Sequence, residues 1–245
     1  MFETELYRLD DLQNGYSIYQ DTRDFCFGID AVLLSDFAEK RMKNNSKVMD
    51  LCTGNGIIPL LLKSRNSTLK ITANEILDNS ARLAKYNFEY NNTDIELIHC
   101  DANKIDNIHN GRYDYVTINP PYMAVGRGEK NEQPNVSCAR HETHFTLEEI
   151  SYVCAKMLKD KGDVFMVHRV NRLSEIFVEF RKFKLEIKQI RYIHSKYFDS
   201  AKLCLISAKK NSGAWLEVLP PLYVYKDNDT YTDEILEIYG GNIDK

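Results

Sequence analysis

A buried-strand pattern, a glycine-containing turn and a helical pattern follow one another early in the chain, and together they constrain its fold most. Residues 46–51 are apolar enough for a buried strand, residues 52–56 read Cys-Thr-Gly-Asn-Gly, and residues 57–65 have helical periodicity. Pro59 is tolerated in the first turn of a helix, where main-chain N–H groups have no helical partner. This order of elements begins an α/β fold built on a parallel sheet.

Strand and helix patterns alternate along most of the chain and predict a seven-stranded sheet with helices on both faces. The predicted strands span residues 46–51, 69–76, 95–100, 113–118, 162–168, 185–194 and 201–209. The predicted helices span residues 31–42, 57–65, 78–90, 146–159 and 173–183, with a last one from residue 232. We expect a mostly parallel sheet whose antiparallel last strand pairs with the sixth at the sheet edge. The expected helix caps are Asp30, Asp78 and the capping box of Thr146 with Glu149.

Charge is distributed unevenly along the chain. The formal net charge is −4 at pH 7, which by itself does not favour a nucleic acid partner. Residues 151–212 nevertheless hold fourteen lysines and arginines against six acids. This basic half is consistent with a phosphate-facing patch, and equally with a solvated face that has no partner.

Cysteine usage and hydropathy indicate the compartment. Six cysteines are scattered without a C-x-x-C pair, so no metal site is expected, and such usage fits the reducing cytoplasm. No apolar run reaches the roughly 18 residues that a membrane-spanning helix needs. The acidic, mixed N-terminus lacks the basic start and apolar core of a signal peptide. We therefore expect a cytoplasmic protein with no membrane partner.

Polar residues stand at the carboxyl ends of four predicted strands. In chain order they are Asp50, Glu75, Asp101 and Asn119. The carboxyl ends of parallel strands line the ligand crevice in α/β folds. The four residues therefore predict one shared binding site at that edge of the sheet.

The tetrapeptide Asn119-Pro120-Pro121-Tyr122 forms a rigid loop at the fourth strand end, because two prolines cannot continue the strand. The Asn119 side-chain oxygen and the Pro120 carbonyl can accept two N–H hydrogens, while the Tyr122 ring can stack on a flat group. This set suits a planar amide or amine. The alternative is a proline-stiffened surface turn.

The glycine turn favours a cofactor without a pyrophosphate group. Neither G-x-G-x-x-G nor Gly-Lys-Ser/Thr occurs, and these are the patterns of phosphate-binding turns. Glu75 lies about twenty residues beyond the turn, where an acid binds ribose hydroxyls in such folds; an exposed strand-end acid is the alternative. Asp101 can accept a hydrogen bond from an adenine amine or cap a helix.

These residues resemble the Rossmann-type S-adenosylmethionine-dependent methyltransferases. Asp50–Gly56 is similar to their first motif, with Cys52 in place of the usual glycine, and Asn119–Tyr122 is similar to their N-P-P-Y motif. The resemblance implies a Rossmann-like methyltransferase domain over residues 46–245, with residues 1–45 as an N-terminal extension and helix packed on its core. It implies S-adenosyl-L-methionine as the cofactor. The implied cofactor-binding residues are Gly28, Asp30, Asp50, Thr53, Gly54, Gly56, Glu75, Asp101 and Ala102.

An ordered series of motifs over nearly the whole chain is similar to the tRNA(Val) adenine-N6 methyltransferase family. The series comprises residues 25–34, 54–62, 119–122, 139–142, 167–173 and 220–222. It implies tRNA as the partner and the adenosine beside the anticodon as the substrate. Catalytic roles are implied for Asn119, Pro120 and Tyr122, and substrate contacts for Pro121, Arg140, His141, His168, Arg169 and Arg172. A structural role is the alternative for His168, and a solvated loop is the alternative for residues 140–142.

The implied reaction is methyl transfer to the exocyclic N6 amine of that adenosine. The amine is a poor nucleophile because its lone pair is delocalised into the ring. Asn119 and the Pro120 carbonyl would accept its two hydrogens and favour a pyramidal nitrogen, while Tyr122 stacks on the base. A glutamine amide in a protein presents the same two hydrogens, so N5-methylation of protein glutamine stays open. A non-catalytic RNA-binding protein of the same fold is the other alternative.

Overall fold

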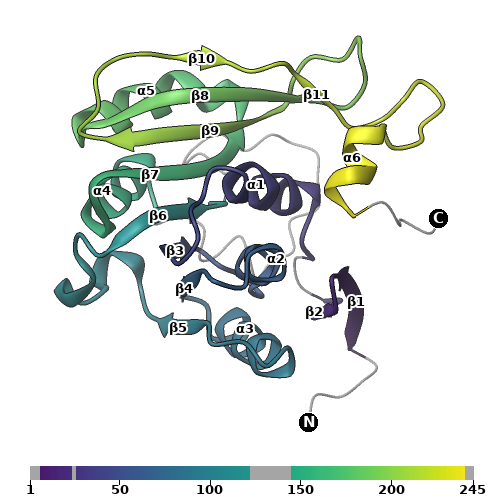
Figure 1. Cartoon of the computed structure of the whole chain (residues 1–245), viewed down its shortest axis with the longest axis horizontal. Coiled ribbons are helices and arrows are strands. Elements are labelled where there is room, and N and C mark those ends of the chain that lie inside the picture. Colours follow the sequence, from purple (N-terminus) through teal and green to yellow (C-terminus); the bar gives the residue numbers. More distant parts are fainter. Residues whose placement is uncertain (1–5, 24–25, 122–144, 241–245) are drawn as a thin grey trace.

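A large mixed sheet forms the centre of the molecule, as Figure 1 shows. The computed structural model describes residues 6–23, 26–121 and 145–240. The spatial order of the strands is β10-β8-β9-β7-β6-β3-β4-β5, and β11 also pairs with β8. The strands are β3 (Lys47–Leu51), β4 (Lys70–Glu75), β5 (Glu96–His99), β6 (Tyr113–Ile118), β7 (Leu158–Arg169), β8 (Leu185–His194), β9 (Leu203–Lys210), β10 (Glu217–Val218) and β11 (Leu222–Tyr223).

All seven predicted strands are present, and the prediction of a mostly parallel sheet is confirmed. β5, β4, β3, β6 and β7 pair in parallel, and β9 is antiparallel to both of its neighbours, β7 and β8. The prediction missed two features. The sheet has nine strands, because β10 and β11 pair in parallel with the outer side of β8. The antiparallel last strand is also inserted between β7 and β8, so the sheet edge lies beyond it.

Helices cover both faces of the sheet, as predicted (Figure 1). One apolar core contains residues of α1 (Ile29–Glu39), α2 (Ile57–Arg65), α3 (Asp78–Tyr90) and α6 (Asp233–Ile238). The other contains residues of α4 (Leu147–Met157) and α5 (Leu173–Lys182). Strand β3 serves both cores because successive side chains alternate between the faces: Val48 packs in the first core, and Met49 and Leu51 pack in the second.

Of the three predicted helix caps, one is confirmed and two are wrong. The capping box at Thr146 is confirmed, since Glu149 N–H donates to its hydroxyl at 3.2 Å and the Glu149 carboxylate accepts from its N–H at 2.8 Å. Asp30 is wrong as an N-cap, because α1 begins at Ile29 and Asp30 lies in its first turn. Asp78 is likewise the first residue of α3 and not its cap. No helix in the described part of the chain is long and apolar enough to cross a membrane.

A hairpin of β1 (Tyr7–Gln13) and β2 (Tyr16–Asp21) precedes α1. Asn87 of α3 and Asn91, directly after that helix, attach it to the body of the molecule. The Asn87 side chain accepts from Tyr19 N–H at 2.8 Å and donates to Tyr19 O at 3.0 Å. Asn91 makes the same pair of bonds with Ser17, at 2.9 and 2.7 Å. Main-chain N–H and C=O groups at the edge of β2 therefore bond to asparagine side chains, where a third strand would otherwise pair with them.

Candidate active site

The four strand ends singled out in the sequence meet at one edge of the sheet. Strands β6, β3, β4 and β5 are neighbours in that order and run in parallel. Leu51 at the end of β3 is level with Asn74 on one side and Ile118 on the other. The residues that end or directly follow these strands therefore lie side by side, as parallel-sheet geometry requires.

The glycine turn between β3 and α2 has the backbone that only a small residue adopts easily. Gly54 and Gly56 have φ angles of 58° and 90°, in the left-handed region. A Cβ atom at Gly56 would lie 2.5 Å from the Phe88 ring, whereas one at Gly54 would have nothing within 4 Å. Gly54 thus opens onto free space on the side where a ligand approaches. The Asn87 amide supports the turn from behind by donating to Asn55 O at 2.9 Å.

Cys52 also has a left-handed backbone, with φ at 57°. This is the position at which the resembling methyltransferases usually have glycine, and the conformation costs an L-residue about 1–2 kcal/mol. Desolvation raises the pKa of the Cys52 thiol well above its ordinary value, so the thiol stays protonated at neutral pH. Cys52 therefore adopts the left-handed backbone conformation that glycine would adopt at this position.

Glu75 ends β4 and fixes the glycine turn to its neighbour strand. One carboxylate oxygen accepts from Gly54 N–H at 2.8 Å, and the other accepts from Ile76 and Leu77 N–H at 2.8 and 2.9 Å. Burial raises the pKa of Glu75, and these three N–H groups act in the opposite direction. The carboxylate is buried and held directly beside the glycine turn.

The next residue, Ile76, was not singled out from the sequence. Its side chain is 57% exposed although it is large and apolar. It stands at the tip of β4 beside the glycine turn, where an apolar surface can cover a planar group. The signal available in the sequence was an apolar residue directly after a strand-end acid.

Asp101 and Ala102 follow β5 and start the short helix η1 (Ala102–Lys104). The Asp101 carboxylate accepts from Asn103 N–H at 2.9 Å, so the helix-cap alternative is realised. Ala102 is buried. Asp101 retains its second oxygen at the site edge, where Lys104 lies 3.8 Å away.

Asp50 is fully buried behind the glycine turn. Its Oδ1 accepts from the Thr117 hydroxyl at 2.6 Å. Burial raises the pKa of Asp50 to about 7, and the Thr117 hydroxyl acts against this shift. The Thr53 hydroxyl acts in the same direction as that of Thr117, so Asp50 and Thr53 belong to one buried polar cluster behind the turn.

Asn119, directly after β6, is oriented by a residue distant in the sequence. Its Nδ2 donates to Asp30 Oδ2 at 3.3 Å, while Asp30 Oδ1 accepts from Ala31 N–H at 3.0 Å. A carboxylate only accepts, so the Asn119 amino group faces Asp30 and the Oδ1 acceptor is turned the other way. A Cβ atom at Gly28 would lie 2.8 Å from Asp30 Oδ1, so the glycine leaves room for this carboxylate. The start of α1 is thus part of the site.

The remaining predicted catalytic and substrate-contact residues differ in how far they are buried. Pro120 is buried and Pro121 is exposed. His168, at the end of β7, is 2% exposed, and its Nδ1 accepts from Arg169 N–H at 2.9 Å. Burial lowers the pKa of His168 to about 4, so it is neutral at pH 7. These observations favour the structural alternative for His168.

Arg169, the last residue of β7, is exposed. Arg172 pairs with Glu175 at 2.7 Å. Tyr122, Arg140, His141 and the rest of the polar segment 122–144 lie outside the described residues, so their predicted roles stay predictions.

Three carboxylates, from Asp30, Asp50 and Glu75, surround the glycine turn and Asn119. Such a lining suits a ligand that carries positive charge, such as the sulfonium and ammonium groups of S-adenosylmethionine. In the described residues, no group of three or more His, Cys, Asp or Glu side chains is arranged to hold a metal ion. The residues present therefore fit a cationic nucleoside cofactor.

The fold and this site define a Rossmann-like S-adenosylmethionine-dependent methyltransferase. The chain belongs to the methyltransferase small domain family, whose model matches residues 28–189. The match begins at the glycine that precedes α1 and ends within β8. S-Adenosylmethionine is the cofactor of this class.

Two curated relatives carry the same name, tRNA1(Val) (adenine(37)-N6)-methyltransferase. The protein from Trichodesmium erythraeum is 27% identical over 191 residues, which cover 74% of this chain and 78% of the relative. The protein from Flavobacterium psychrophilum is 24% identical over 232 residues, which cover 92% of this chain and 95% of the relative. The similarity to the second relative thus extends over nearly the whole length of both chains.

Solved structures share the fold. A predicted O-methyltransferase from Agrobacterium tumefaciens superposes with a TM-score of 0.70 at 18% identity, over 86% of this chain and 96% of that one. TYW2 from M. jannaschii in complex with AdoMet superposes with a TM-score of 0.58 at 14% identity, over 85% of this chain and 88% of that one. At these identities the likeness concerns the fold alone.

Cofactor affinity is expected to depend on pH through Asp50. A cationic ligand binds the ionised carboxylate better, so binding should strengthen as the pH rises through the Asp50 pKa of about 7. At pH 6 the ionised form is about a tenth of the population, and the apparent affinity should be about tenfold below its plateau. Calorimetric titration with S-adenosylmethionine between pH 5.5 and 8 measures this.

The Asp50→Asn variant is the control for that titration, because it keeps the acceptor for Thr117 and removes the titrating group. Its affinity should vary with pH only as far as the ligand's own amino group titrates. Identical pH profiles for the wild type and the variant would show that Asp50 does not sense the cofactor charge.

Proposed function

We propose that this protein methylates the exocyclic N6 amine of an adenosine in tRNA, namely the adenosine beside the anticodon of a valine tRNA. One structural observation carries the chemistry: the Asn119 amide is held at the cofactor edge of the sheet with its acceptor turned away from Asp30. The substrate class is supported by the shared name of relatives that match 74% and 92% of this chain.

Asn119 and Pro120 perform the recognition of the amine in this proposal. The Asn119 Oδ1 accepts one N6 hydrogen and the Pro120 carbonyl accepts the other, which draws the nitrogen lone pair out of conjugation with the ring. The cofactor supplies an electrophilic methyl group. Asp30 keeps the Asn119 amino group away from the substrate, because an amide turned the other way would present a donor to a donor.

The proton of the amine needs no strong base at the site. After methylation the nitrogen is acidic enough to release a proton to water. His168 is buried and faces its own main chain, so it takes no part. The chemistry therefore depends on positioning rather than on acid–base catalysis.

An adenine reaches Asn119 only when it leaves its stack, since Asn119 is partly buried and follows a strand. Unpaired bases of RNA loops are splayed out at small cost, whereas a base in a duplex must first be unpaired. A loop adenosine such as the one beside the anticodon is the substrate that this geometry favours.

Transfer of a labelled methyl group tests the substrate class. Purified protein is incubated with methyl-labelled S-adenosylmethionine and either total tRNA or total cell protein, both from a strain that lacks the gene. We expect label in the tRNA that ribonuclease releases and protease does not. Label that appears only in protein would contradict the proposal and favour methylation of glutamine, whose amide presents the same two hydrogens.

A further inference from the structure

The loop of residues 195–202 joins β8 to β9. It lies at the end of the sheet where β6 finishes and Asn119 follows. β7 and β8 are both antiparallel to β9 and therefore run in the same direction as β6. Arg169 of β7 and Ile193 of β8 pair with the same residue, Leu203 of β9, so the ends of these strands are level. Three strand spacings separate β6 from β8, which is on the order of 14 Å.

This loop carries a cluster of aromatic side chains that the core does not use. Phe198 is 91% exposed and Tyr197 is 63% exposed. Their ring centroids are 4.9 Å apart, and the Tyr197 ring lies 5.4 Å from that of Tyr223 on β11. Exposed aromatic groups that pack on one another mark interaction surfaces in soluble proteins.

Hydrogen bonds within the loop hold it in a defined shape. His194 Nδ1 lies 2.6 Å from Asp199 O, and Asp199 Oδ2 accepts from Lys196 N–H at 3.2 Å. Asp199 N–H in turn donates to Lys196 O at 3.1 Å. The aromatic rings therefore stand on a preorganised turn, which reduces the entropy lost when a partner binds.

Positive charge flanks the aromatic cluster on the side of the active site. Arg169 and Lys202 are exposed, and Val170 N–H donates to Lys202 O at 3.0 Å, so the two segments are adjacent. Lys196 pairs with Asp229 at 2.7 Å and adds no net charge. Arg169 and Lys202 are thus two neighbouring cations at this end of the sheet, in a chain whose net charge is −4.

We infer that Tyr197, Phe198 and Tyr223 form a stacking platform for an unpaired nucleotide of the RNA substrate, with Arg169 and Lys202 meeting its phosphates. Aromatic rings beside basic groups are the combination that binds single-stranded nucleic acid, because every base has a flat face and every phosphate a charge. A protein partner would match the rings but not the charges. A second copy of this chain would bring the same charges into repulsion. The inference rests on the proposed function, since an RNA must be the substrate.

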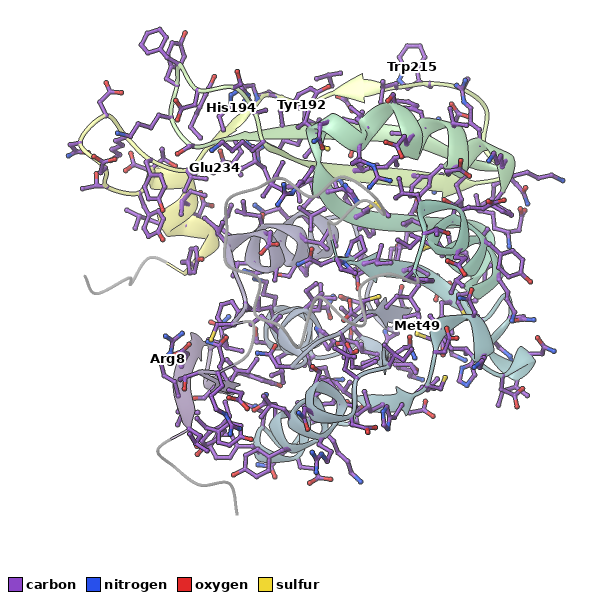
Figure 2. All side chains as sticks on the ribbon, turned by 180° about the vertical axis from the view of Figure 1, so that it is seen from behind. Arg8, Met49, Tyr192, His194, Trp215 and Glu234 are labelled. Carbon is purple, nitrogen blue, oxygen red and sulfur yellow. The ribbon has the colours of Figure 1, made fainter. Side chains whose placement is uncertain are left out.

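Alanine at Phe198 tests the platform. With an unmodified valine tRNA transcript as the probe, Phe198→Ala is expected to raise KM about tenfold, while kcat and the affinity for S-adenosylmethionine stay within twofold of the wild type. Tm should be unchanged, because the side chain is almost fully exposed. Trp215→Ala is the matched control. Trp215 is 75% exposed and precedes β10, and Figure 2 shows it well apart from His194 along the top of the molecule.

A second variant tests the charges. The Arg169→Ala, Lys202→Ala double variant should lower the slope of log Kd against log salt for the same tRNA by about two. A slope equal to that of the wild type would overturn the assignment of phosphate contacts to this edge.

Binding of the tRNA, measured by fluorescence anisotropy without cofactor, separates this inference from the proposed function. Weaker binding by Phe198→Ala but not by Trp215→Ala supports the platform, even if the wild type transfers no methyl group and the proposed function fails. Equal binding by all three proteins overturns the platform and leaves the function standing if methylation persists. Self-association of the wild type that Phe198→Ala abolishes, with tRNA binding unchanged, also overturns it.

Discussion

Asn119→Ala is expected to lower methyl transfer by about 10²–10³-fold, with the affinity for S-adenosylmethionine unchanged. Loss of one positioned polar contact to the reacting group has effects of this size, because the contact is made more strongly in the transition state than in the ground state. Asn119 bonds to Asp30 and makes none of the contacts that hold the glycine turn, so the cofactor site should survive. Steady-state kinetics and calorimetric titration of the cofactor measure the two quantities.

The matched control is Asn110→Ala, since Asn110 is exposed and bonds to Asn107 in a surface turn. It should retain full activity. Turnover of Asn119→Ala within threefold of the wild type would show that this amide does not hold the substrate amine. A parallel loss of cofactor affinity would instead place Asn119 in the cofactor site.

Asp30→Asn is expected to lower kcat about 10–100-fold through the orientation of Asn119. The wild-type carboxylate accepts from Asn119 Nδ2 and from Ala31 N–H, so it fixes which end of the amide faces the substrate. An amide at residue 30 can donate as well as accept, which permits the reversed orientation of Asn119. Misplacement of a group that orients a reactant has effects of this order.

Measuring kcat and the Kd for S-adenosylmethionine separately shows whether Asp30 contacts the cofactor or positions Asn119. The sequence resemblance implies that Asp30 contacts the cofactor, in which case Asp30→Asn should raise the Kd for S-adenosylmethionine. A positioning role leaves that Kd unchanged and lowers kcat alone. Asp36→Asn is the control on the same helix, because Asp36 pairs with Lys40 at 2.9 Å and not with Asn119, and kcat should stay unchanged.

Local patterns in the sequence were sufficient to predict most of the sheet. β3, β6 and β7 contribute apolar side chains to both cores, so their hydropathy alone marks them. β10 was not predicted because its two residues, Glu217 and Val218, are exposed and show no apolar pattern. The position of β9 between β7 and β8 escaped because the order of strands in space is a property of long-range pairing.

The candidate site was predictable where a residue ends a strand. Glu75 and Asn119 lie at the sheet edge as expected, since chain direction fixes which end of a parallel strand they occupy. The bond between Asp30 and Asn119 was not predictable, because it joins residues 89 positions apart and depends on how α1 packs. The burial of His168 depends in the same way on neighbours that the local sequence does not identify.

The position of the transferred methyl group tests the account most directly. A valine tRNA is incubated with the protein and S-adenosylmethionine that carries a deuterated methyl group, digested to nucleosides and analysed by mass spectrometry against standards. We predict that the label is found in N6-methyladenosine and is lost with Asn119→Ala. Label in a methylated guanosine, or in adenosine methylated on a ring atom, would contradict a site that holds an exocyclic adenine amine between Asn119 and Pro120.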